Sequence, residues 1–135
     1  MDVVLQTNDR DKSLGLFSVR RFADNSGYCV DLRVLSHGFT VDMPFCFEPP
    51  RLTEFIEQLE RMNQTLTGEA CLKPTYETNY FRLAMGHTGA VIVTGELWTL
   101  HDGEDHRIRF GFRTDQTCLS PLIGDLRSCL GMATV

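Results

Sequence analysis

The Asp102-Gly103 pair restricts the fold more than any other short stretch of this chain. Both residues tolerate a positive φ angle, and Asp-Gly between two alternating segments is the strongest short signal for a β-hairpin. With these two residues as the loop, a single register pairs apolar residues on one face of the hairpin and complementary polar residues on the other. It gives these cross-strand partners: Leu97 with Ile108, Val93 with Phe112, Glu96 with Arg109, and Trp98 with Arg107. We therefore predict a long antiparallel hairpin with one apolar face, and with an ion pair and a cation–π contact on the other face.

A helix is expected directly after this hairpin, at about residues 117–130. Apolar residues recur there at steps of three and four, as on a helix with one buried stripe: Leu119, Leu122, Ile123, Leu126 and Leu130. Either Asp115 or Thr117 can accept the free amide hydrogens of its first turn. Gly131 is a natural stop, and Gly124 is expected to allow close approach to the sheet. We expect the stripe to cover the apolar face of the preceding strand.

A second hairpin is predicted over residues 28–47, with His37-Gly38 as its loop. Pairing across this loop places every large apolar residue on one face and sets Arg33 opposite Asp42 on the other. Pro44 within the second strand lacks an amide hydrogen, so strand 39–47 is expected at a sheet edge or beside a bulge. A turn of Asp, Asn, Ser and Gly at residues 24–27 precedes this hairpin.

A third hairpin is predicted around the turn at residues 87–89, and a helix lies between the second and third hairpins. In the third hairpin Met85 faces Val91 and Leu83 faces Val93. The helix, at about residues 50–64, opens on prolines suited to a first helical turn. Its apolar stripe is Leu52, Phe55, Ile56, Leu59 and Met62. On its other side Glu57 and Arg61 are spaced to form an ion pair.

These elements predict an α+β fold. We expect one antiparallel, strongly curved sheet of about six to eight strands built from hairpins, with two helices (about 50–64 and 117–130) packed on it. The length of 135 residues suits a single domain, 1–135. Neither a membrane span nor a secretory signal is recognisable, which favours a cytoplasmic protein with no membrane partner.

The five cysteines are odd in number and include no CxxC pair, which argues against a disulfide framework and a zinc knuckle. The register of the second hairpin places Cys29 directly opposite Cys46. A cross-strand disulfide is one outcome of that placement. In a reducing cytosol two free thiols are favoured.

The sequence carries no motif that predicts a catalytic residue, a cofactor or a metal. Neither a glycine-rich phosphate loop nor the GxSxG elbow of serine hydrolases occurs. A metal site would have to gather His101, Asp102 and His106, but the tight turn needs Asp102 and the two histidines stand across strands. The row Arg107, Arg109 and Arg113, with Arg82 nearby, could touch phosphates. We predict no nucleic acid partner, because Arg109 has Glu96 and Arg107 has Trp98 as a structural partner, and the net charge is -5.

Three segments of the chain resemble a known family of small bacterial proteins. They are the start of a short strand at residues 68–72, Asn79-Tyr80 before a glycine-turn hairpin, and the run Phe112-Arg113-Thr114-Asp115-Gln116-Thr117-Cys118-Leu119. The resemblance covers the chain from about Leu14 onward and is to WapI-like immunity proteins. It implies a non-enzymatic cytosolic inhibitor that binds a toxin domain delivered by neighbouring bacteria.

Two groups of carboxylates lie outside the predicted core and are candidates for contact with such a toxin. They are Glu54, Glu57 and Glu60 on the first helix, and Asp102, Glu104 and Asp105 at the tip of the last hairpin. Many toxins of this kind are nucleases with basic clefts, and complementary charge speeds the encounter of two proteins. The acidic balance of the chain therefore suits a basic toxin domain.

Two other classes of function stay open at the level of sequence. One is a small-ligand-binding or enzymatic domain with a pocket between sheet and helices, lined by Tyr28, Phe47, Tyr80 or Trp98. The other is a homo-oligomeric structural module, for example a homodimer joined through the strand edge at Pro44.

Overall fold

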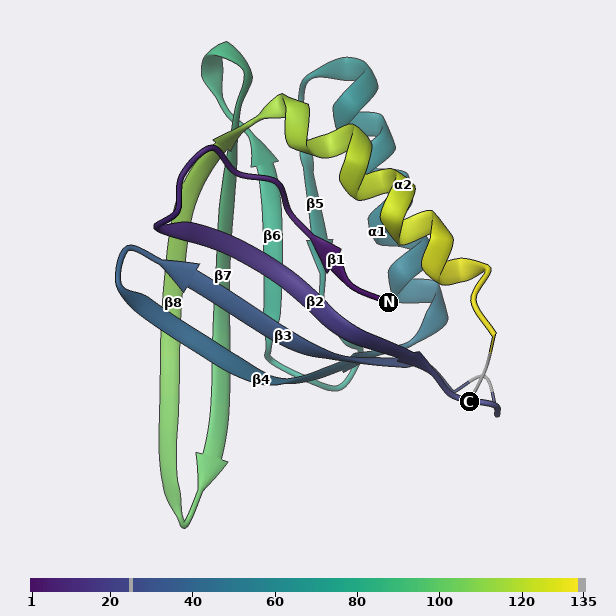
Figure 1. Ribbon diagram of the computed structural model, residues 1–135, viewed down its shortest axis with the longest axis vertical. Helices are drawn as coiled ribbons and strands as arrows, with labels where there is room; N and C mark the ends of the chain where they lie inside the picture. The colour runs from purple at the N-terminus through teal and green to yellow at the C-terminus, as the bar shows by residue number, and fades with distance from the viewer. Residues whose placement is uncertain (25, 134–135) are drawn as a thin grey trace.

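The computed structural model describes residues 1–24 and 26–133, and it arranges them as two antiparallel sheets and two helices (Figure 1). The first sheet has the order β1-β2-β3-β4, with the bounds Val3–Val4, Lys12–Arg21, Tyr28–Ser36 and Phe39–Phe47. The second has the order β5-β6-β7-β8, with the bounds Glu69–Leu72, Tyr80–Met85, Ala90–His101 and Glu104–Asp115. The helices are α1, Pro49–Thr65, and α2, Leu119–Leu130. The fold is therefore α+β.

The prediction of one curved sheet of six to eight strands is wrong, because the strands divide into two sheets of four. The division falls at α1, which follows β4 directly. Strand β4 is an edge strand that carries Pro44, as predicted, and proline cannot donate a hydrogen bond to a further strand. Strand β5 pairs with β6 instead. In Figure 1 the strands of the first sheet cross obliquely over those of the second.

The registers of all three predicted hairpins are confirmed. Leu97 faces Ile108, Val34 faces Val41, and Met85 faces Val91. The loops take the left-handed conformations that their residues favour, with φ of 54° at Asp102 and 79° at Gly103. Of the predicted turn at 24–27, Asn25 lies outside the described residues, and Asp24 accepts a hydrogen bond from the Ser26 amide at 3.0 Å.

One hydrophobic core fills the space between the two sheets and the helices. The five residues of the α1 stripe are buried, as predicted: Leu52, Phe55, Ile56, Leu59 and Met62. The predicted ion pair between Glu57 and Arg61 does not form. The ion pairs of α1 instead join Arg51 to Glu54, at 3.1 Å, and Glu60 to Arg127 of α2.

Helix α2 packs mainly on α1 and β1, so the prediction that it covers β8 is wrong. The core-facing Phe110 and Phe112 of β8 belong to the common hydrophobic core, and the edge of β8 contacts the first sheet, where Ser36 on β3 donates a hydrogen bond to the Gly111 carbonyl at 3.2 Å. A 3-10 turn, η2 (Gln116–Cys118), leads into α2, and the Asp115 carboxylate caps it by accepting from the Thr117 amide at 2.9 Å. Gly124 is exposed and touches no part of the sheet, contrary to expectation.

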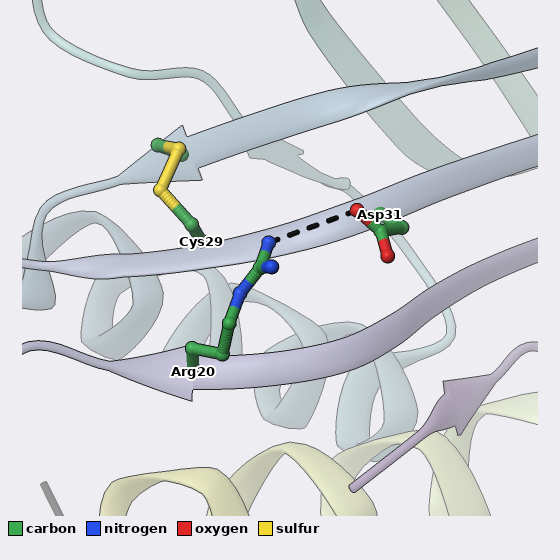
Figure 2. The surroundings of a disulfide bond; sticks show 4 residues. Arg20, Cys29 and Asp31 are labelled. Carbon is green, nitrogen blue, oxygen red and sulfur yellow. Dashed lines mark ion pairs between the residues drawn. A yellow bond between two sulfur atoms is a disulfide. The ribbon is translucent and has the colours of Figure 1, made fainter. Parts of the chain in front are cut away.

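Cys29 and Cys46 face each other as predicted, but they form a disulfide rather than two free thiols (Figure 2). The register brings their Cα atoms within 4.1 Å on the outer face of the first sheet, so the two sulfurs need no change of backbone to meet. On the adjacent strand Arg20 faces Cys29 and forms an ion pair with Asp31 at 3.7 Å. The other three cysteines, Cys71, Cys118 and Cys129, are free.

Candidate protein-binding surface

The β7–β8 hairpin extends beyond the rest of the molecule (Figure 1). Leu97 and Ile108 form the last apolar pair on its core-facing side, and the next pair on that side is Thr99 with His106. No apolar side chain therefore holds the final turns of the hairpin against the core. Residues 98–107, which we call the hairpin tip, are exposed apart from the half-buried Thr99.

The hairpin tip presents two large apolar side chains to solvent. Trp98 is 38% exposed and Leu100 is 54% exposed. They lie on the same face of β7, because side chains two residues apart in a strand point the same way. The sequence pattern contained this signal, since the register that buries Leu97 turns Trp98 and Leu100 outward, but the prediction used Trp98 only as an arginine or pocket partner.

Trp98 is held in place by hydrogen bonds at both ends. Its amide donates to the Asn79 side-chain oxygen at 2.7 Å, and its indole nitrogen donates to the Asp105 carboxylate at 3.4 Å. The same carboxylate pairs with Arg107 at 3.2 Å. The predicted cation–π contact between Trp98 and Arg107 is not formed, because Asp105 takes the guanidinium.

The carboxylates of the tip differ in how they are engaged. Asp105 is shared between Trp98 and Arg107. Asp102 and Glu104 are exposed, and neither has an ion-pair partner within residues 1–24 and 26–133. The tip therefore joins two exposed apolar side chains to carboxylates that are available to a partner.

The carboxylates predicted on α1 form a separate group, on the part of the molecule away from the tip (Figure 1). Glu54 pairs with Arg51, and Glu60 pairs with Arg127 on α2. Glu57 remains as the exposed member without an ion pair in the described part of the chain. Two of the three α1 carboxylates are thus engaged within the fold, and no large apolar side chain is exposed between them.

The arginine row is mostly engaged in ion pairs. The predicted pair of Arg109 with Glu96 is confirmed, at 2.6 Å, and Arg82 lies 3.9 Å from Glu69. With Arg107 paired to Asp105, Arg113 is the member without an ion pair among the described residues. Each nearby acid reduces the positive potential that phosphate binding would require.

The arrangement offers little to nucleophilic or metal chemistry. Burial, and then the nearby Asp115 carboxylate, raise the pKa of the Cys118 thiol to about 12. Burial also raises the pKa of Cys71 and Cys129, so all three thiols stay protonated at neutral pH and are weak nucleophiles. The rings of His101 and His106 lie 6.2 Å apart, and the described residues contain no group of three or more metal-ligating side chains. Neither helix in that part of the chain is long and apolar enough to cross a membrane.

The aromatic residues suggested as alternatives for a pocket lining do not share one hollow. Tyr28 and Phe47 stack with ring centroids 5.7 Å apart and border a hollow of about 320 Å³, although both are almost fully buried. An open hollow of about 610 Å³ lies at the base of the hairpin tip and includes Trp98, whereas Tyr80 borders a different hollow. Three separate hollows therefore border these residues, and none of the three includes all four of them.

Comparison with known proteins links the chain to one family. The sequence model of the Immunity protein WapI-like family matches residues 7–132, which is nearly the whole chain. No curated protein and no solved structure matches this chain.

Proposed function

Since the chain belongs to the Immunity protein WapI-like family, we propose that it neutralises a protein toxin by binding it, and that the hairpin tip makes the central contact. The observation that carries this placement is the exposure of Trp98 and Leu100 on one face of a projecting hairpin, whose loop end also carries Asp102 and Glu104. Exposed aromatic side chains on fixed elements supply a large share of the binding energy in many protein interfaces.

Charge supports a basic partner for this surface. The chain has a net charge of -5, and Asp102 and Glu104 are the tip carboxylates without an internal cation among the described residues. Opposite charge on a toxin domain would raise the association rate and orient the two proteins. Neutralisation then requires no chemical step: the bound protein covers the working surface of the toxin.

The test is isothermal titration calorimetry with the toxin domain encoded next to this protein's gene. We expect Trp98→Ala to weaken binding about 30-fold, the usual cost of truncating an aromatic residue at the centre of an interface. Glu104→Lys is expected to slow association, because it reverses a charge on the contact surface.

Glu57→Lys is the matched control, because it reverses an exposed carboxylate that has no ion pair, on α1 instead of the tip. It should leave the affinity unchanged. If Glu57→Lys weakens binding and the tip variants do not, the contact lies on α1 and the placement at the tip is wrong. Absence of binding by the wild-type protein would overturn the proposed function itself.

A further inference from the structure

Three of the four edge strands of the two sheets carry a feature that hinders pairing with another chain. Strand β1 has two residues and contacts α2. Strand β4 carries Pro44, whose missing amide is one of the groups that would point outward. On β5 the outward amide of Cys71 donates to the Gln58 side chain of α1 at 2.9 Å. Proteins protect sheet edges in such ways because unprotected edges pair with other strands.

Strand β8 is the fourth edge, and the part of it nearest the tip is open. In a two-residue hairpin the pair next to the loop is hydrogen-bonded, and hydrogen-bonded pairs then alternate with pairs whose backbone groups point outward. With His101 paired to Glu104, the outward groups on β8 belong to Asp105, Arg107, Arg109, Gly111 and Arg113. The last two fit this alternation: the Gly111 carbonyl accepts from Ser36 at 3.2 Å and the Arg113 carbonyl accepts from Lys12 at 2.7 Å.

The outward backbone groups of Asp105, Arg107 and Arg109 have no such partner among the described residues. The corresponding position on the other side of the hairpin is occupied, since the Trp98 amide donates to Asn79. The tip therefore offers a run of three residues along which another extended chain can form a hydrogen-bonded ladder.

A groove lies along this open edge. It has a volume of about 530 Å³, and its lining includes Phe39 at the β3–β4 loop and Ile108 on β8. The Phe39 side chain is 69% exposed, the highest value among the large apolar residues of the sheets. A strand placed beside β8 would direct every second side chain toward these two residues.

We propose that the β8 edge from Asp105 to Arg109 receives an extended segment of a basic protein partner, which adds to the second sheet as a further strand. Apolar side chains of that segment enter the groove between Phe39 and Ile108. Basic residues beside the segment face Asp102 and Glu104, because Arg107 and Arg109 already have carboxylate partners. The identity of the partner as a toxin domain rests on the proposed function, and the mode of binding follows the strand addition seen at exposed sheet edges.

Arg107→Pro tests this mode, with Arg107→Ala as its matched control. Both variants lose the ion pair with Asp105, but only proline removes the outward amide. The hydrogen bonds within the hairpin come from the even-numbered residues of β8 and remain in both. In calorimetry with the neighbouring toxin domain, we expect Arg107→Pro to weaken binding about tenfold or more relative to Arg107→Ala.

Arg109→Pro and Arg109→Ala provide a second comparison at the next outward amide, and circular dichroism checks that each variant is folded. Equal affinity of folded proline and alanine variants at both positions would overturn the edge proposal, while the proposed function would stand if the wild type binds. If neither proline variant folds, hydrogen exchange of the wild-type complex decides. Protection of the amides of residues 105, 107 and 109 supports strand addition, and unchanged exchange overturns it.

Discussion

Gly95 shows how a single residue sets the packing of the longest hairpin. A Cβ atom added there would lie 2.6 Å from two ring atoms of Phe110, its cross-strand partner, and 2.7 Å from the Tyr80 carbonyl. The Phe110 ring can cross β7 only because position 95 has no side chain. The alternation of the sequence predicted the pairing of these strands, but it contained no signal that the Phe110 ring lies over Gly95.

Gly95→Ala should therefore lower the free energy of unfolding by about 1–3 kcal/mol, the usual cost of forcing an extra methyl group into a packed core. The matched control is Gly124→Ala, where nothing lies within 4 Å of the new Cβ atom. In α2 that change should raise the free energy of unfolding by about 0.5–1 kcal/mol, because alanine loses less backbone entropy than glycine in a helix. Urea unfolding of both variants is the measurement. Similar effects of the two substitutions would contradict the close contact at Gly95.

The hairpins were predictable as elements because two signals agree in each. Turn residues such as Asp102-Gly103 fix the loop, and the burial of one face then fixes the register. Contacts on the exposed faces were less predictable. Arg109 forms the expected ion pair with Glu96. Arg107 instead forms an ion pair with Asp105, two residues away on its own strand, and not the predicted contact with the facing Trp98. On the exposed face several partners of similar energy compete, and the register alone does not select one.

The disulfide across the second hairpin is also a feature of a single structural element. Register placed Cys29 opposite Cys46, but the sequence has no feature that decides between thiols and a bond. The two cysteines are separated by 17 residues, so the bond closes a short loop of the unfolded chain.

Reduction of this disulfide should lower the free energy of unfolding by about 3 kcal/mol, because the unfolded chain regains the conformational entropy that a closed loop of this size had lost. Urea unfolding with and without a phosphine reductant measures the change. The Cys29→Ala, Cys46→Ala double variant is the control, because it should not respond to the reductant. An identical unfolding midpoint of the wild type in both conditions would contradict a stabilising bond.

At the scale of the whole molecule, the division into two sheets could not be predicted from the local alternation of apolar and polar residues. Each hairpin was correct by itself, but sequence alternation does not state which hairpins share a sheet. Pro44 was the clue, since it marked β4 as an edge and so marked where the first sheet ends. The prediction that α2 covers β8 was wrong for the same reason, because chain order does not state which elements pack together. The chain order suggested α2, whereas the contact of the first sheet with β8 joins segments far apart in the sequence.

The candidate site was also predictable only in its local features. Sequence named the tip carboxylates, and whether they or the α1 group touch a partner stays a prediction. What the sequence could not supply is the projection of the tip beyond the core, the open edge of β8, and the groove beside Phe39. Each of these depends on how the two sheets are placed against each other.

Amide hydrogen exchange across the whole chain, with and without the neighbouring toxin domain, tests the central claim most directly. If the tip and the β8 edge bind the toxin, the complex should slow exchange in residues 98–109 and leave α1 unchanged, because only buried or newly bonded amides gain protection. Protection confined to α1, or none in the presence of excess toxin domain, would contradict the account.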